Sequence, residues 1–192
     1  MSQSAHHRFT YADYLRRERE TGLKHEFLDG QVFAMTGGTP EHARLIAALM
    51  VAVAPRLKPG CRLFSADLKI RIPETGLATY PDGAVVCGEL EHPSDDELAV
   101  TNPTVLFEVL SPQHRRPGTE AYDRGEKWAH YRRLASLRAY VLVDPPTTQL
   151  ECFGRSDVRD TFTRRRATAG DALAIPGLDG ALEVDALFAQ RL

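Results

Sequence analysis

Acidic side chains stand inside apolar runs at two places in this 192-residue sequence. Asp82 lies in the segment YPDGAVVC, and Glu108 is flanked by leucine, phenylalanine and valine in TVLFEVLS. Burying a lone carboxylate costs free energy unless the group is paired or binds a metal. Asp82 is near the start of its predicted strand, where such a residue often only caps a turn. Glu108 is therefore the stronger sign of a functional acid.

Two carboxylates on neighbouring strands can hold Mg²⁺, which takes few protein oxygens and keeps several waters for substrate. Such a site suits phosphodiester cleavage, because the metal lowers the pKa of an attacking water and stabilises the leaving oxygen. A nearby cation would help, and Lys127 is the candidate for orienting the water or neutralising charge at the transition state. The alternative for Lys127 is a surface ion pair with Asp123, four residues earlier.

Composition and local motifs narrow the function classes only a little. P-loop, dinucleotide-binding, zincin and esterase motifs are missing. The 24 basic and 26 acidic residues give a net charge of -2, so contact with nucleic acid would need a local basic patch. The stretches 115–133 and 155–166 each carry three more basic than acidic residues and could hold phosphates. The alternative for both stretches is a solvated surface.

The elements that must position these residues follow from periodicity and turn chemistry. Thr10 predicts the cap of a helix that runs through Arg19 and stops at Gly22, and Thr39 predicts the cap of a second, mostly buried helix. The dipeptide Asp29-Gly30 predicts a two-residue hairpin turn. Strands are predicted over 25–35 (as this hairpin), 62–72, 79–87, 104–111, 138–144, 149–154 and 161–168, the three from 62 to 111 pairing in one sheet.

Two further helices are predicted, over 119–134 and 184–190, and the acidic segment 88–103 is predicted to be an exposed loop. This order of elements predicts an α/β fold with a mixed sheet. The length indicates a single domain over residues 1–192.

The apolar runs are too short for a membrane span, since the longest covers ten residues (45–54) and a span needs about 20. The N-terminal segment has no secretory signal. We therefore expect no membrane association and a cytoplasmic location. Cys61, Cys87 and Cys152 are odd in number and far apart, so we expect three buried thiols.

Four segments together resemble the Uma-type restriction endonuclease family, a branch of the PD-(D/E)XK nuclease superfamily. They are EFLDGQVFAMTGGTPEHARL, YPDGAVVC, NPTVLFEVLSP and YDRGEKWAHYRRLASLRAYVLVD. Each motif is weak alone, but their order over roughly 10–187 makes the combination specific. The resemblance implies a restriction-endonuclease-like core, with a central mixed β-sheet flanked by helices.

The resemblance also implies roles for single residues. Asp82 and Glu108 match the two metal-binding acids. The usual lysine two residues after the second acid is replaced by Leu110, which implies that the lysine has moved to the following helix as Lys127. Glu26 matches an auxiliary acid that completes the site through metal or water.

Other positions match the family less directly. His42 matches a family position, with a structural role in the first turn of its helix as the alternative. Asp67 and Lys69 are similar to a family motif, and strand alternation would place them on one face of a site-facing edge. Two departures stand out: the inserted segment QHRRPG at 113–118, and Gly83 where the family tends to have a β-branched residue.

The resemblance implies a Mg²⁺-dependent endonuclease acting on DNA, with Mn²⁺ as an alternative metal. A homodimer is expected, because two-fold symmetry serves the cleavage of both strands of a duplex. Two alternatives stay open. One is a nucleic-acid-binding or interaction protein that keeps the fold without turnover, which the 113–118 insertion favours. The other is a nuclease acting on RNA.

Overall fold

The structure is a computed structural model that describes residues 8–35, 37–111, 121–158 and 161–189. Its helices are α1 (Tyr11–Thr21), α2 (Pro40–Val53), the 3₁₀ turn η1 (Ala54–Arg56), the π-helix η2 (Tyr122–Lys127), α4 (Trp128–Tyr131) and α5 (Val184–Phe188). Its strands are β1 (His25–Leu28), β2 (Gln31–Ala34), β3 (Cys61–Ser65), β4 (Lys69–Ile72), β5 (Leu77–Thr79), β6 (Gly83–Cys87), β7 (Ala99–Val100), β8 (Val105–Val109), β9 (Ala139–Asp144), β10 (Gln149–Arg155), β11 (Phe162–Ala167), β12 (Ala172–Ala174) and β13 (Ala181–Glu183).

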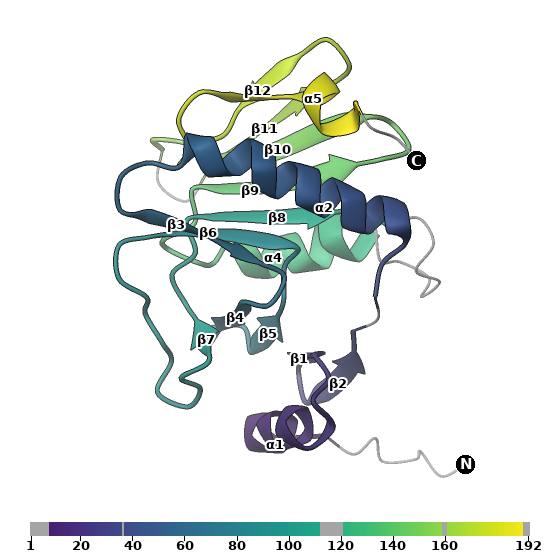
Figure 1. Ribbon diagram of the computed structural model, residues 1–192. Helices are drawn as coiled ribbons and strands as arrows, with labels where there is room; N and C mark the ends of the chain where they lie inside the picture. Colours follow the sequence, from purple (N-terminus) through teal and green to yellow (C-terminus); the bar gives the residue numbers. More distant parts are fainter. Residues whose placement is uncertain (1–7, 36, 112–120, 159–160, 190–192) are drawn as a thin grey trace, which may run out of the picture.

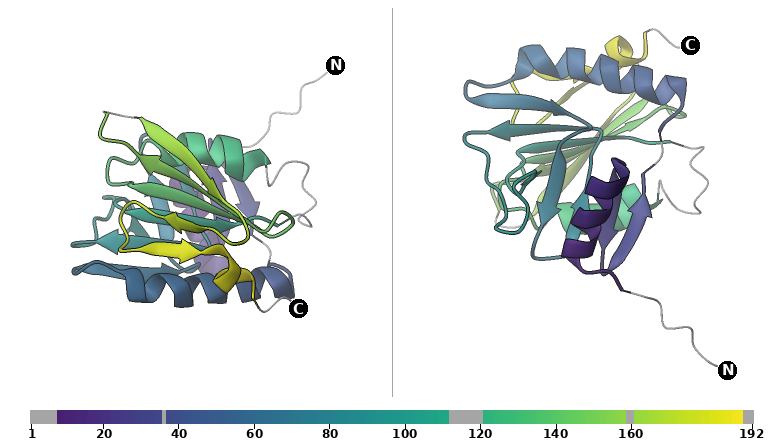
Figure 2. Two further views of the ribbon diagram at one scale, coloured as in Figure 1. Left: turned by 90° about the horizontal axis from the view of Figure 1, so that it is seen from above. Right: turned by 60° about the horizontal axis from the view of Figure 1, so that its bottom comes forward.

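Two mixed sheets form the frame of the molecule. The six-stranded sheet has the order β11-β10-β9-β8-β6-β3 and is parallel only between β8 and β9. The five-stranded sheet has the order β2-β1-β5-β4-β7 and is parallel only between β4 and β7. Helices α2 and α4 cover opposite faces of the six-stranded sheet (Figure 1; Figure 2, left). The prediction of an α/β fold with mixed sheet flanked by helices is confirmed.

Two of the predicted strands are each divided between the two sheets, which the expectation of one common sheet did not foresee. The segment 62–72 forms β3 and β4, separated by a turn in which Leu68 N–H donates to the Ser65 carbonyl at 3.2 Å. The segment 79–87 is interrupted at Pro81, which has no N–H for a ladder, so that β5 and β6 separate there. The segment 88–103, predicted as an exposed loop, contributes β7.

Local turn chemistry was predicted more successfully. Thr10 caps α1 by accepting from Asp13 N–H, and Gly22 ends the helix at a φ of 64°. Asp29 and Gly30 connect β1 and β2 at φ values of 50° and 78°. Both are positive, as a two-residue hairpin turn that follows the twist of the strands requires.

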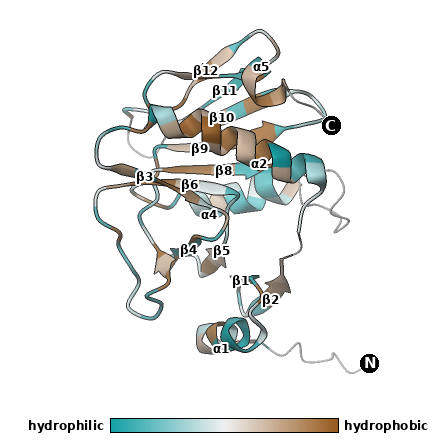
Figure 3. Cartoon of the chain, in the orientation of Figure 1, coloured by the Kyte–Doolittle hydropathy of each residue, from teal (hydrophilic) through white to brown (hydrophobic). Residues whose placement is uncertain are grey.

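Strand β8 separates two hydrophobic layers. Val105, Phe107 and Val109 belong to the core beneath α2 and α5, whereas Leu106 and Leu110 belong to the core shared with α4 and the five-stranded sheet. The central strands and the middle of α2 are correspondingly hydrophobic (Figure 3). Strand alternation turns Glu108 toward the second layer, between the two sheets. Within the described part of the chain, no helix is long and apolar enough to cross a membrane.

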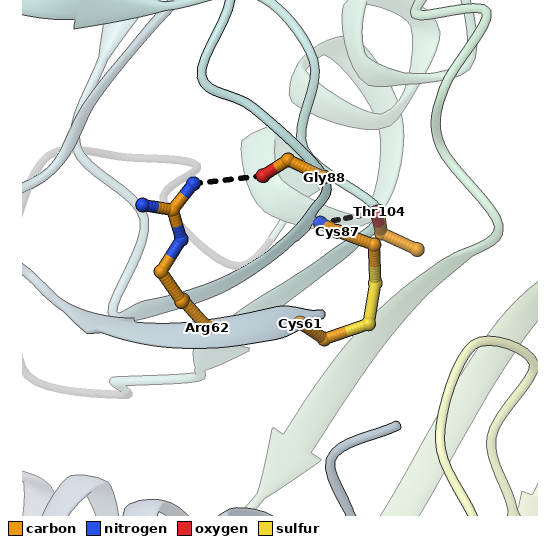
Figure 4. The surroundings of a disulfide bond; sticks show 5 residues. All are labelled: Cys61, Arg62, Cys87, Gly88 and Thr104. Carbon is orange, nitrogen blue, oxygen red and sulfur yellow. Dashed lines mark hydrogen bonds between the residues drawn. A yellow bond between two sulfur atoms is a disulfide. The ribbon is translucent and has the colours of Figure 1, made fainter. Parts of the chain in front are cut away.

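The expectation of three free thiols is wrong for two of them. Cys61 and Cys87 stand directly opposite one another on β3 and β6 and form a disulfide (Figure 4). The sequence gives no sign of this, because 26 residues separate them and only the strand register brings their Cα atoms to 3.9 Å. Cys152 is a buried free thiol as predicted, and burial raises its pKa to about 12.

Candidate active site

The two predicted metal-binding acids meet where β8 ends. Asp82 is not inside a strand but directly precedes β6, and Glu108 is the fourth residue of β8. The backbone N–H of Val109 donates to Asp82 Oδ2 at 2.7 Å. This hydrogen bond fixes the Asp82 carboxylate beside the residue that follows Glu108. The antiparallel pairing of β6 with β8 thus brings together two acids that are 26 positions apart in the sequence.

Lys127 reaches the same place from the helix that follows. Its Nζ lies 2.6 Å from Glu108 Oε1 and 3.5 Å from Asp123 Oδ1. The side chains of Lys127 and Glu108 are only 6% and 7% exposed. Tyr131 donates its hydroxyl to the same Glu108 oxygen at 3.1 Å. Lys127 and Asp123 are thus part of a buried cluster, and the alternative of a mere surface pair is wrong.

The electrostatics of this cluster show more negative charge than the lysine compensates. Burial raises the pKa of Glu108 well above its ordinary value; Lys127 opposes this rise, while the charges of Asp123 and Asp82 add to it. Burial also raises the pKa of Asp123, against the effect of Lys127. Burial alone would lower the pKa of Lys127, but the neighbouring carboxylates, Glu108 foremost, raise it well above its ordinary value. The lysine is therefore a permanent cation at the site.

The helix that carries Lys127 begins in an unusual form. The prediction was an ordinary helix over 119–134, whereas Tyr122–Lys127 form the π-helix η2 before α4 continues the chain. π-helical turns are rare in proteins, and many of those that occur lie at functional sites. Here Lys127 contacts both Glu108 and Asp123, while Arg124 forms ion pairs with Asp144 and Glu151 on the neighbouring strands. The inserted segment 113–118 lies outside the described residues.

Glu26 joins the site from the five-stranded sheet. Its two carboxylate oxygens accept hydrogen bonds from the hydroxyls of Tyr122, at 2.7 Å, and Thr79, at 2.6 Å. Its charge also contributes to the raised pKa of both Lys127 and Asp123. The structure therefore brings all four predicted site residues into one electrostatic cluster, with Glu26 held at its margin by two hydroxyl donors.

His42 lies on the other side of Asp82. It stands in the first turn of α2, where Thr39 Oγ1 accepts from its backbone N–H. Its Nε2 is 3.4 Å from Asp82 Oδ2. Burial lowers the pKa of His42, but the hydrogen bond and charge of Asp82 outweigh burial and raise it overall. A Cβ atom at Gly38 would lie 2.3 Å from the imidazole Nδ1, so a side chain there would displace the ring.

The expectation of a site-facing edge at Asp67 and Lys69 is wrong. Asp67 has a side chain that is 81% exposed and forms an ion pair with Lys24 in the turn between the sheets. Lys69 is buried under α1, with its Nζ 2.9 Å from Glu18 and 3.0 Å from Asp96. The two residues fall on separate elements because the predicted strand is divided there.

Gly83, the second departure from the family pattern, has a packing reason. A Cβ atom at this position would lie 2.4 Å from Met50 Cε. The methionine of α2 therefore occupies the space that a β-branched side chain would need. Glycine at position 83 therefore allows α2 to pack closely on β6 immediately beside Asp82.

A hard divalent cation fits the donor set of this site. The available ligands are carboxylate oxygens. Burial, and after it the charges of neighbouring carboxylates, raises the pKa of Glu108 and Asp123, and a bound cation would stabilise both groups in their ionised form. The described residues hold no group of three or more histidine, cysteine or acidic side chains arranged as a metal cage. Mg²⁺ does not need one, because it is commonly held by one or two carboxylates together with substrate phosphates and water.

Four contributors to the site were not assigned from the sequence: Asp123 as part of the buried cluster, and Thr79, Tyr122 and Tyr131 as hydroxyl donors. A signal for two of them was present. Asp123, Lys127 and Tyr131 recur every four residues, the spacing that places side chains on one face of a helix. Tyr122 had no such signal, because its partner Glu26 is 96 residues away.

Comparison with known proteins shows the family and the fold of this chain. The chain is 32% identical to an uncharacterized Synechocystis protein, slr1290, over 92% of this chain and 89% of that protein. It is also 32% identical to the uncharacterized Synechocystis protein sll1609, over 70% of this chain and 74% of that protein. A crystal structure described as "a putative nuclease belonging to DUF820", from Anabaena variabilis, shares the fold with a TM-score of 0.72. Its sequence identity is 16%, and the match covers 94% of this chain and 98% of that one.

The model of the Uma2 family, described as "Putative restriction endonuclease", matches residues 11–185. That range includes both sheets and the residues of the acidic site, Glu26, Asp82, Glu108, Asp123 and Lys127. Membership and fold together support a nuclease-like function. The chain belongs to the Uma2 family of restriction-endonuclease-like proteins.

Proposed function

We propose that this protein is a Mg²⁺-dependent endonuclease that hydrolyses phosphodiester bonds of DNA. The observation that carries the proposal is the buried ion pair between Lys127 and Glu108, 2.6 Å long, beside Asp82 at the end of β8. A buried charged pair surrounded by further carboxylates is costly to the fold, and such costs are typical of functional sites. The family match supports the same chemistry.

Asp82 and Glu108 would hold the metal, with Mn²⁺ as a substitute for Mg²⁺. When bound, the ion would polarise the phosphate and lower the pKa of an attacking water. Glu108 also positions Lys127 through the direct ion pair. The Lys127 ammonium, kept protonated by its acidic neighbours, would neutralise the negative charge that grows on the phosphate oxygens.

Glu26 acts from the margin of the cluster. Because Tyr122 and Thr79 each donate a hydrogen bond to it, the carboxylate is held in one orientation. From there it can accept a proton of the attacking water while the water oxygen forms the new P–O bond. The P–O ester bond to the leaving oxygen breaks in the same displacement, and the leaving oxygen keeps the bonding electron pair and takes a proton from solvent.

The test is a plasmid-nicking assay with calorimetric titration of Mg²⁺ into the same preparations. Asp82→Asn and Glu108→Gln should each lower cleavage by at least 100-fold and abolish metal binding. Asp67→Asn is the matched control, because it removes a carboxylate that the structure places in an exposed turn. A wild-type protein that binds neither Mg²⁺ nor Mn²⁺ and leaves DNA intact would refute the proposal and favour a binding protein without turnover. Cleavage of RNA but not DNA would refute DNA as the substrate and leave the nuclease activity in place.

We also propose that two chains act together on a duplex, since a symmetric dimer presents one site to each strand. Light scattering of the protein with a short duplex should return the mass of one duplex plus two chains of 21.3 kDa each. A species of one chain per duplex at cleaving concentrations would refute the dimer.

We retain the cytoplasm as the proposed compartment. Disulfides rarely persist in a reducing cytosol, so the Cys61–Cys87 pair offers a direct test. If the protein is in the cytoplasm, thiol trapping in intact cells should find this pair reduced, and the disulfide would then form only under oxidising conditions. A fully oxidised pair would count against the cytoplasmic location.

A further inference from the structure

A second charged cluster lies on the far side of η2 from the acidic site. Glu151 on β10 is 1% exposed, yet three arginines contact its carboxylate. Arg164 bonds through Nε and Nη2 at 2.7 and 2.8 Å, and Arg166 through Nε at 3.1 Å. Arg124 bonds at 3.0 Å and also reaches Asp144 at 2.6 Å. We name these five residues the Glu151 cluster.

The Glu151 cluster presents arginine side chains to solvent. Three guanidinium groups contact the carboxylates of Glu151 and Asp144. Two of the three arginines of β11 contact Glu151 and are also well exposed, Arg164 by 47% and Arg166 by 51% of their side chains. Glu151 thus holds two solvent-facing guanidinium groups in fixed positions. Such ordering lowers the entropy cost of a later contact, and the planar fork of arginine matches phosphate oxygens.

Strand register relates the cluster to the acidic site. Glu108 pairs with Leu142, Leu142 with Glu151, and Glu151 with Arg166, so these residues form one row across β8, β9, β10 and β11. Three strand spacings of about 4.8 Å put Arg166 roughly 14 Å from Glu108. At a rise of about 3.4 Å per nucleotide, this distance corresponds to about four nucleotides of a strand. Figure 1 shows β11 at the edge of the described six-stranded sheet, beside β10.

We propose that Arg164 and Arg166 bind the phosphate backbone of the nucleic-acid substrate, about four nucleotides from the bond that is cut. The inference rests on the proposed nuclease function for the position of the substrate, and goes beyond it by naming the surface that holds it. Arg124 connects the two regions, because it bonds to Glu151 from the same helical turn that carries Asp123 and Lys127. The contact is with phosphates and carries no base specificity.

An alternative reason for arginines on β11 is protection of an open sheet edge, and the chain contains a matched control for it. Arg165 lies between the two proposed residues and is also exposed, but its register partner is Cys152, whose side chain lies on the opposite face. Edge protection uses all three arginines alike. Phosphate binding beside the acidic site uses only Arg164 and Arg166.

The experiment measures binding of the full chain to a 20-base-pair duplex by fluorescence anisotropy in EDTA, at several salt concentrations. Each phosphate contact contributes about 0.9 to the slope of log K against log salt. The double variant Arg164→Gln/Arg166→Gln should therefore lower the magnitude of this slope by about 1.8. Arg165→Gln should leave the slope unchanged. An unchanged slope in the double variant, an equal loss in Arg165→Gln, or no binding by the wild type would each overturn the inference.

Removing both arginines leaves the buried Glu151 with Arg124 alone and could unfold the chain, so the triple variant that adds Glu151→Gln is measured as well. It carries no buried unpaired charge at this position and should show the same loss of slope. Plasmid cleavage with Mg²⁺ separates the two proposals. If the wild type cleaves plasmid but the variants keep the salt slope of the wild type, only the proposal about the arginines is refuted. A loss of slope in a protein that never cleaves refutes only the nuclease.

Discussion

At the scale of single residues, the site is governed by charges that cannot be removed one at a time. Glu108 and Lys127 are both buried and form an ion pair with each other. Lys127 counteracts the rise that burial causes in the pKa of Glu108, and Glu108 raises the pKa of Lys127. The loss of one partner leaves the other without compensation in a low-dielectric interior. Stability and activity at this site are therefore linked.

Lys127→Met should lower the free energy of unfolding by about 3 to 5 kcal/mol, because it leaves the Glu108 carboxyl buried without its cation. The double variant Glu108→Gln/Lys127→Met should recover much of this loss, since it removes both charges. Urea unfolding of the wild type, both single variants and the double variant measures the coupling. Strictly additive losses would show that the two groups do not form the pair seen here.

His42 should titrate above its ordinary pKa of 6.5 in metal-free protein, because Asp82 stabilises the imidazolium. In Asp82→Asn the pKa should fall, since the largest contribution that raises it is lost while burial still lowers it. Because the folded pKa exceeds the unfolded one, the pair stabilises the fold fully below pH 6.5 and loses this effect as pH rises through the folded pKa. NMR titration of the His42 ring measures both values. An identical pKa in the two proteins would contradict the pair.

At the scale of elements, helix ends and strand ends set the positions of the site residues. Helix α2 presents His42 from its first turn, β6 begins one residue after Asp82, and η2 carries Asp123 and Lys127 on its inner side. Each of these ends has a local cause in the sequence. The caps and breaks are therefore as relevant to function as the acids themselves.

Thr39→Ala should lower the free energy of unfolding by about 1 kcal/mol, because the backbone N–H of His42 loses its cap. Hydrogen exchange should also become faster in the first turn of α2. Thr39→Ser keeps the hydroxyl and should behave as the wild type in both measurements. Equal effects of the two substitutions would mean that the methyl group, and not the cap, is what matters.

At the scale of the whole molecule, the site lies between two sheets. The disulfide connects the edge strand β3 of the six-stranded sheet to its neighbour β6. Cys61–Cys87 connects β3 to β6, the strand that begins after Asp82 (Figure 4). A cross-link over 26 residues limits the unfolded chain more than the folded one. It should therefore stabilise the domain without forming part of the site.

The double variant Cys61→Ala/Cys87→Ala should be less stable by about 3 kcal/mol, from the loss of loop-closure entropy. A reducing agent should lower the stability of the wild type by a similar amount and leave the double variant unchanged. Thermal and urea unfolding with and without the reductant measure both effects. A wild type insensitive to the reductant would contradict a stabilising disulfide.

The sequence by itself determined the class of fold, the turns and caps, and the four candidate residues Glu26, Asp82, Glu108 and Lys127, because these depend on local patterning and on motifs. Only the tertiary structure decided how they meet. The disulfide and the Glu151 cluster depend on strand register between distant segments. The division of 62–72 between two sheets and the π-helical turn are likewise seen only in the folded chain. Register arises from packing of the whole core, so no local pattern could specify it.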